Sequence, residues 1–369
     1  MNRHRNPLAP AALSLALLAC VGARATAPAP APVTDSRIAW SNLDHLIQQS
    51  GDEPEALELL MQRSRYLADA QALDRIVAIT ESHAASADEL IRRARARAAT
   101  HRFDDALADL DAAQRAGASP AAVQGQRSSI HVATGRADDE LPRLRAAAAR
   151  RPGFASHCAL ALAEAAAGRL EDADAHYVEA LNELDTTSPF PAAAIWFARG
   201  LMWSEQAGDA RRGEAMYAQA LRGLPEYVAA NVHLAELEAA RGDLPAAIAH
   251  AQRAVAAGDD PEALALLGTL HVRDGRETLG RGEIERARQS FEALLARHPQ
   301  AFADHAAEFY LGAGADPERG LHWAQVNLLV RETRRALQLG IRAARETHHL
   351  EEARFLEERL QRRFDPRAA

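Results

Sequence analysis

The segment GRLEDA at Gly168–Ala173, followed by Tyr177, decides how this chain is built. It returns as GDLPAA at Gly242–Ala247, again with small apolar residues every three or four positions after it. Weaker copies recur along most of the chain at intervals of about 34 residues. A period of this length is typical of stacked helix pairs, each of which buries its apolar face only against its neighbours. The repeat therefore predicts an all-α solenoid.

The repeat resembles the tetratricopeptide repeat (TPR), whose pattern is W-x2-L-G-x2-Y, then A-x3-F, then P. The resemblance implies a right-handed superhelix of TPR-like helix pairs over residues 37–369. Small residues are expected where two helices approach closely, and Gly or His is expected at the turn that ends each first helix. The close-approach positions are Ala161, Gly200, Ala235 and Gly268 on first helices, and Ala173, Ala247 and Ala287 on second helices.

Two places break the period. Ser188–Pro191 interrupts it before the fifth pair, and Asp274–Gly282 is about seven residues longer than the motif allows. Two extra helical turns and a protruding loop both fit the longer segment. An amphipathic stretch at 38–49 predicts a cap helix before the first pair. The more regular pairs are predicted at 53–86, 87–120, 121–153, 154–187, 228–260 and 301–333, and the ninth pair ends near Arg363.

Composition excludes some classes of partner. The 369 residues carry a formal net charge of −8, so a general attraction to nucleic acid is not expected. All 43 basic residues are Arg, which we attribute to the GC-rich codons of a bacterial genome rather than to a binding chemistry. Charge is uneven along the chain, with 7 Arg against 16 acidic residues over 154–260 and 12 Arg against 9 over 86–153.

The first 25 residues have the features of an export signal. Arg3 and Arg5 precede an apolar stretch that is too short to span a bilayer as a stable helix. Two cleavage sites compete: a lipobox-like sequence that ends at Cys20, and the A-x-A motif at Ala23–Ala25. Lipidation of Cys20 predicts an outer-membrane lipoprotein, whereas cleavage after Ala25 predicts a soluble periplasmic or secreted protein. The Pro/Ala-rich residues 26–36 are expected to form an extended linker.

Catalytic motifs are missing from the sequence. It has no G-x-S-x-G, H-E-x-x-H, P-loop or C-x-x-C pattern, so we predict no enzyme activity, cofactor or metal site. His305 and Glu308 share a helix face, and His348 precedes His349 at a turn; structural roles are expected for both. Cys158, the second of two cysteines, is expected to pack on a helix, although an intermolecular disulfide is possible.

Binding is the function that the resemblance implies. TPR arrays present an extended concave surface, lined mostly by the first helix of each pair at positions that packing does not use. A Lys/Asn carboxylate clamp is not expected, because the chain has no Lys and Asn231 falls at a packing position. The candidate peptide-binding residues are Arg92, Arg95, Gln126, Ser129, Leu162, His233, Glu236 and Thr269.

These observations predict a scaffold or assembly adaptor that binds a protein or peptide partner in the bacterial cell envelope. Contact with a membrane is expected only through a lipid at Cys20. Two rivals stay open: a structural lipoprotein spacer without a defined ligand, and an unrecognised periplasmic enzyme. A deep groove with clustered polar groups would favour the binder over the spacer, and convergent histidines and carboxylates in a closed pocket would favour the enzyme.

Overall fold

The computed structural model describes residues 34–82 and 86–364, which are all-α and contain no strand. The export signal, Cys20 and most of the linker lie outside these residues. The helices are α1 (Ser36–Ser50), α2 (Ala56–Leu67), α3 (Ala70–Ser82), α4 (Ala87–Ala99), α5 (Phe103–Arg115), α6 (Pro120–Ala133), α7 (Ala137–Arg150), α8 (Phe154–Ala166), α9 (Leu170–Asn182), α10 (Pro189–Leu201), the π-helix η1 (Met202–Gln206), α11 (Ala210–Gly223), α12 (Val228–Arg241), α13 (Leu244–Ala257), α14 (Pro261–Arg273), α15 (Glu277–Arg297), α16 (Pro299–Leu311), α17 (Pro317–Val330), α18 (Arg334–Glu346) and α19 (Leu350–Phe364).

In the described residues, α1 forms a cap and is followed by nine helix pairs, from α2–α3 to α18–α19. This arrangement confirms the predicted α-solenoid. The turns between paired helices use left-handed backbone, as expected from their residues. Gly168 has φ +77° and Gly242 has φ +91°, a region that glycine adopts without steric cost. His101 and His348 take the same role at φ +56° and +62°.

Small residues lie where the sequence places the helix crossings. Ala161, Ala173, Ala235 and Ala247 are each fully buried. A Cβ atom on Gly200 would lie 2.4 Å from the ring of Tyr217, so only glycine fits there. The long segment 274–282 is helical rather than a protruding loop, because α15 starts at Glu277 and is 21 residues long.

Substitution of a crossing alanine tests this packing. We expect Ala173→Leu or Ala247→Leu to lower the free energy of unfolding by about 1–3 kcal/mol, because the larger side chain must displace a neighbouring helix. Urea titration followed by far-UV circular dichroism measures the change. A loss below about 0.5 kcal/mol, which is typical of surface positions, would place these alanines away from the crossings.

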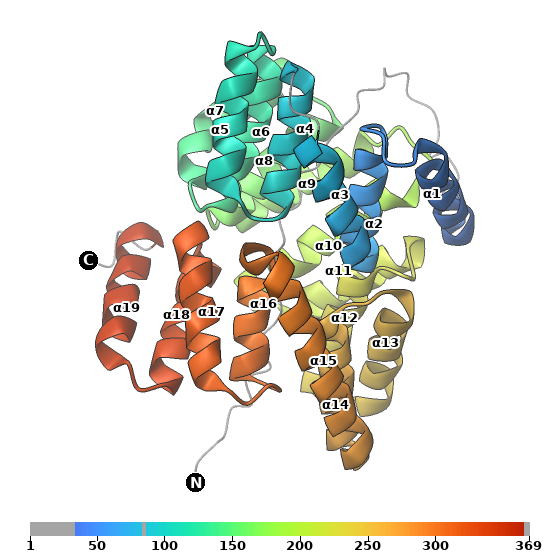
Figure 1. Cartoon of the computed structure of the whole chain (residues 1–369), viewed down its shortest axis with the longest axis vertical. Coiled ribbons are helices and arrows are strands. Elements are labelled where there is room, and N and C mark those ends of the chain that lie inside the picture. The colour runs from blue at the N-terminus through green and yellow to red at the C-terminus, as the bar shows by residue number, and fades with distance from the viewer. Residues whose placement is uncertain (1–33, 83–85, 365–369) are drawn as a thin grey trace.

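The array closes on itself, so helices far apart in sequence lie together (Figure 1). On one side, Trp40 of α1 donates a hydrogen bond to Glu226 at 3.2 Å, and the hydroxyl of Tyr66 donates to the carbonyl of Phe190 at 2.7 Å. On another, Asp74 of α3 pairs with His298 at 2.6 Å. The α6–α7 turn meets α19, where Arg363 donates to the carbonyl of Gly135 at 3.0 Å.

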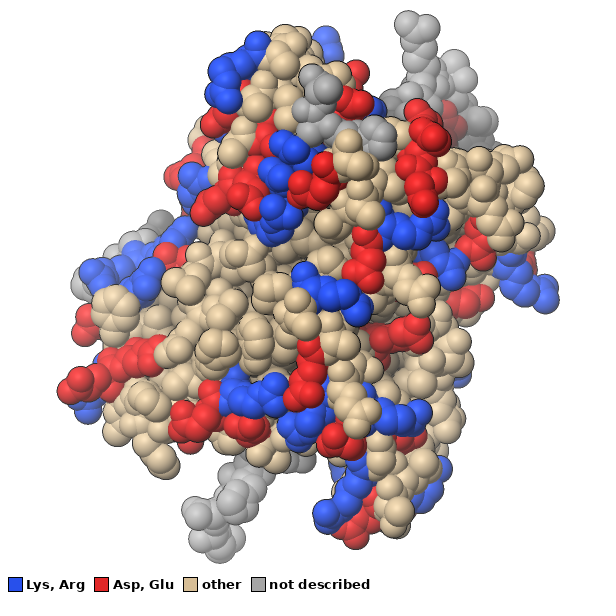
Figure 2. Space-filling view, in the orientation of Figure 1, with Lys and Arg blue, Asp and Glu red and all other residues tan. Residues whose placement is uncertain are grey.

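On the face shown in Figure 2, arginines and carboxylates are interspersed, and neither positive nor negative charge predominates. This mixture agrees with the small net charge of the chain. None of the helices in the described part of the chain has the length and apolar character needed to cross a membrane.

Candidate functional site

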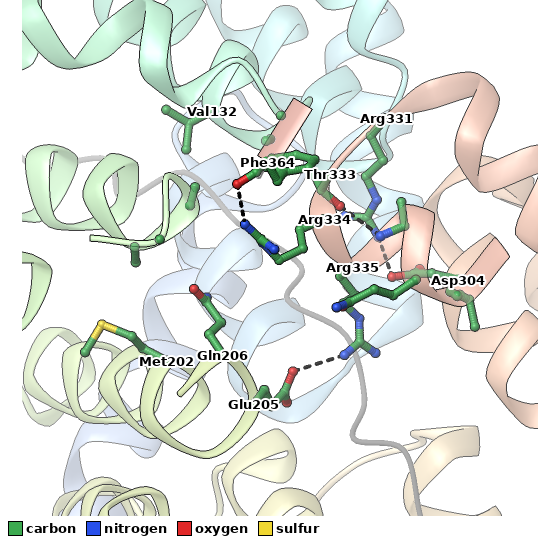
Figure 3. A pocket seen from close by; sticks show the side chains of 18 of the residues that line it. Val132, Met202, Glu205, Gln206, Asp304, Arg331, Thr333, Arg334, Arg335 and Phe364 are labelled. Atoms are coloured by element: carbon green, nitrogen blue, oxygen red, sulfur yellow. Dashed lines mark hydrogen bonds and ion pairs between the residues drawn. The ribbon is translucent and has the colours of Figure 1, made fainter. Parts of the chain in front are cut away.

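A cavity of about 550 Å³, partly open to solvent, lies between α6–α10 and α16–α19 (Figure 3). One wall is apolar and is formed mainly by α6, α8, α9 and α10. The opposite wall carries arginines, carboxylates and amides from α16, α17, α18 and the segment between α17 and α18, and Glu205 and Gln206 of η1 face it from the first side (Figure 3). A volume of this order suits a small organic molecule or a short piece of peptide. The apolar residues of the lining are Val132, Ala133, Leu162, Ala165, Ala166, Leu170, Ala198 and Met202, and the polar residues are Glu205, Gln206, Asp304, Glu308, Asn327, Arg331, Arg334, Arg335, Gln338 and Arg342.

Local helix geometry brings the polar residues to the cavity. On α18, Arg334, Gln338 and Arg342 are four residues apart and therefore lie in one row along the helix. The π-helix η1 continues α10 with a wider turn, closed by the bond from Ala207 N–H to the carbonyl of Met202 at 3.1 Å. This turn places Glu205 opposite α18.

Two arginines of the polar wall hold buried carboxylates, as Figure 3 shows for Arg331 with Asp304 and Arg335 with Glu205. Arg331 also donates to the side-chain oxygen of Asn327 at 2.9 Å. Arg335 bridges two acids, at 3.0 Å from Glu205 and 2.5 Å from Glu308. The Arg335 contacts join the fifth, eighth and ninth pairs across the interior of the array.

A second layer of charges lies behind this wall. His305 contacts Glu262 at 3.1 Å, and its other ring nitrogen is 4.0 Å from Asp304. Burial alone would lower the pKa of His305, but the carboxylates of Asp304 and Glu262 outweigh it and raise the pKa to about 10. Burial would raise the pKa of Asp304, yet Arg331 and His305 hold that pKa well below its usual range. His305 is therefore a cation at neutral pH.

The pKa values of the acids beside Arg335 are raised, whereas the pKa of Asp304 is lowered. Burial raises the pKa of Glu308 to about 8 and that of Glu205 to about 7, in spite of the nearby guanidinium. Burial also raises the pKa of Glu236, which has a second acid, Glu262, nearby. More carboxylates than cations are thus buried in this region, and some of them retain a proton near neutrality.

Stability is expected to fall as pH rises from about 6.5 to 9. The raised pKa of His305 contributes stability that is complete below the unfolded value of about 6.5 and is lost toward about 10. Glu205 and Glu308 act in the same direction, because the folded protein keeps protons that the unfolded chain has released. Circular dichroism melts across this range measure the effect, and His305→Gln is expected to flatten the profile. A midpoint that rises with pH would contradict the burial of these charges.

The eight residues predicted to form a concave binding face do not form one open surface. Leu162 lines the cavity, whereas Arg95 pairs with Glu58 of the neighbouring pair. His233 is only 3% exposed and lies 3.3 Å from Glu236, within the buried charge layer. The closure of the array encloses these positions, which an open solenoid would expose. The remaining four are half-buried on three different helices: Arg92, Gln126, Ser129 and Thr269.

Sequence reasoning found part of the polar wall and missed the rest. It singled out His305 and Glu308 on one helix face, but their partners, Glu262 and Arg335, belong to other repeats. No group of three His, Cys, Asp or Glu side chains in the described residues is placed to hold a metal ion. Asn231 and Cys158 are both fully buried, so both side chains pack as expected.

Comparisons with known proteins give structural likeness only. No family model matches the chain, and no curated protein matches it. The solved structures similar to it include the APC/C hetero-tetramer Cut9-Hcn1, with 14% identity, TM-score 0.49, and coverage of 90% of this chain and 67% of that one. A tetratricopeptide repeat protein from Parabacteroides merdae has 18% identity, TM-score 0.41, and coverage of 70% and 98%. The human IFIT1 dimer with PPP-AAAA has 13% identity, TM-score 0.43, and coverage of 88% and 82%. Likenesses this distant leave function open.

Proposed function

We propose that this chain is a binding scaffold that holds a protein or peptide partner in the bacterial cell envelope, and that the interior cavity is where the partner is gripped. The observation that carries the proposal is the cavity itself, about 550 Å³ in volume with one apolar and one charged wall. Binding sites commonly combine apolar lining with a few polar groups that fix orientation. A spacer without a ligand has no need of such a site.

The charged residues of the cavity also allow a second function to be considered, that of an enzyme. Glu205 and Glu308 line the cavity, and their raised pKa values are a property that active-site acids share. Both carboxylates, however, are paired with Arg335 and link three repeats of the array. This arrangement favours binding over catalysis.

Blocking the cavity tests the proposal. Ala198 is half-buried and lines the cavity, so Ala198→Trp should fill part of it. Ala121→Trp, at an exposed position of α6 that does not line the cavity, is the matched control. We expect affinity capture from envelope extracts to recover one partner with the native chain and the control, and to lose it with Ala198→Trp. Direct binding of the purified partner should follow the same order. Equal recovery with both variants would overturn the role of the cavity.

The cellular location of the protein depends on whether Cys20 is lipidated, and we propose that it is. The lipobox-like sequence Leu17–Cys20 supports the proposal, and an N-terminal acyl group with a diacylglycerol provides stable anchoring. We expect the protein to enter the detergent phase on Triton X-114 partition, globomycin to leave a larger precursor, and Cys20→Ala to abolish acylation without changing the melting temperature. A mature protein that begins at Thr26 without lipid would contradict the anchor and favour a soluble exported form.

A further inference from the structure

We propose that His157 of α8 and His176 of α9 bind a divalent transition-metal ion, with zinc as the reference ion, through their Nδ1 atoms. The site lies in the fourth helix pair and is separate from the cavity, whose lining includes neither histidine. The inference does not depend on the proposed function. Three observations support it: the separation of the two nitrogens, a buried acid behind one of the rings, and a comparison with the sixth helix pair.

The two Nδ1 atoms face each other at a separation of 3.3 Å. This distance is longer than that of most hydrogen bonds from an N–H group, which is about 2.9–3.0 Å. Two nitrogens that each lie about 2.0–2.1 Å from a tetrahedral zinc ion are about 3.3–3.4 Å apart. The ring centroids are 5.5 Å apart, so small rotations of the two side chains direct both nitrogens at one ion. The pair therefore already has the separation that a shared ion requires.

The position and chemistry of the pair suit a transition metal that enters from solvent. The side chain of His176 is 31% exposed, and His157 is half-buried. Imidazole nitrogens bind zinc, copper and nickel, whereas magnesium and calcium prefer oxygen ligands. The described residues contain no group of three metal-binding side chains, so the two histidines are the only protein ligands of this site. At least two positions of a tetrahedral ion are then left for water or an added ligand.

A buried acid, Glu164 of α8, lies behind the ring of His176. Its side chain is 2% exposed, and its Oε1 accepts a hydrogen bond from Arg145 at 3.1 Å. Its Oε2 has no hydrogen-bond partner among the described residues and lies 3.6 Å from Nε2 of His176. A buried acceptor without a donor is costly, so a proton on Nε2 is favoured, and the lone pair is then on Nδ1. Histidines that bind metals commonly donate their other N–H to a carboxylate, so Glu164 positions the ring without touching the ion.

The sixth helix pair has the same arrangement with one of the two histidines replaced. Alignment of the turn glycines of the two pairs identifies its equivalent residues as Asn231, Glu238 and His250. His250 again lies 3.6 Å from its glutamate, but its Nδ1 meets Oδ1 of Asn231 at 2.9 Å, an ordinary hydrogen bond. The contact between acid and histidine is therefore common to both pairs. The second histidine, His157, distinguishes the fourth pair from the sixth, and the repeat accepts asparagine in its place.

Calorimetric titration of the purified chain with zinc chloride tests the site, and magnesium chloride is the control ion. We expect one zinc ion per chain and no heat with magnesium. His157→Asn gives the fourth pair the residue that the sixth pair has, so we expect it to weaken zinc binding at least about tenfold. His250→Asn is the matched control, because it removes a histidine at the same repeat position that faces an asparagine, and we expect it to leave the affinity unchanged. Circular dichroism melts of the metal-free chains check that each variant folds.

X-ray absorption spectroscopy of the native chain loaded with one zinc ion identifies the ligands without any variant, and it decides the question if His157→Asn does not fold. We expect two imidazole nitrogens at about 2.0–2.1 Å from the ion. No zinc binding at millimolar concentration would mean that a hydrogen bond alone joins the two histidines, and the proposal would fail. Fewer than two imidazoles, equal affinity of the native chain and His157→Asn, or an equal loss with His250→Asn would place the ion elsewhere and overturn the site.

Discussion

Removal of residues 333–369 is expected to give a chain that melts well below the full-length protein and aggregates. The deletion takes away α18, whose Leu339 packs in a core cluster with α16 and α17 and whose Leu337 and Ile341 pack in a cluster with Leu328 of α17 and side chains of α19. Each of these side chains contributes about 1.5–3 kcal/mol when fully buried, and their sum is comparable to the total stability of a typical domain, about 5–15 kcal/mol. The deletion also removes Arg335 and leaves Glu205 and Glu308 without the cation that joins them.

A shorter deletion provides the control. Ending the chain before Leu350 removes α19 but keeps α18, and α19 buries only Ala353 and Leu356. We therefore expect a smaller drop in melting temperature, with solubility reduced by the newly exposed face of α18. Circular dichroism melts and sedimentation of the three chains give the comparison. Equal melting temperatures for the full-length and 333–369 deletion chains would mean that the last pair does not stabilise the array.

The fold was predictable because its determinants are local. The residues that determine the fold make contacts only within one helix pair or between neighbouring pairs. Examples are the left-handed turn at Gly168, the small residue Ala173 and the aromatic Tyr177. Their spacing in the sequence therefore predicts the structure. The same argument explains the irregular seventh pair, whose extra length follows from the spacing of its motif residues. Whether that length forms helix depends on packing against α14, which spacing alone does not reveal.

The site was not predictable because its determinants are not local. Arg335 and Glu205 are 130 positions apart and meet only because the array closes. A repeat pattern predicts how each pair stacks on the next, but the small rotation from pair to pair accumulates over nine pairs and decides which distant helices touch. His305 and Glu308 were visible as a helix face with two titratable groups, whereas nothing in the sequence identified Glu262 or Arg335 as their partners.

The ion pair between Arg331 and Asp304 provides the most direct test of the charged interior. Arg331 is 8% exposed and Asp304 only 1%, so Arg331→Met leaves a carboxylate that is buried with its principal cation gone. We expect the free energy of unfolding at pH 7 to fall by about 3–5 kcal/mol, the usual cost of breaking a buried pair from one side. Urea titration measures the loss, and Arg345→Met, at a pair whose arginine is 62% exposed, should change stability by less than about 1 kcal/mol.

The double variant Arg331→Met with Asp304→Leu separates the loss of the pair from the burial of a lone charge. Replacing both partners by apolar groups of similar volume is often close to neutral, so we expect the second substitution to restore part of the stability that the first removes. The restoration should be incomplete, because Asp304 also helps to keep His305 protonated. A double-mutant cycle gives the interaction energy directly. If the two losses simply add, the side chains do not interact in solution, and the charged wall of the cavity is not held in the arrangement that the structure shows.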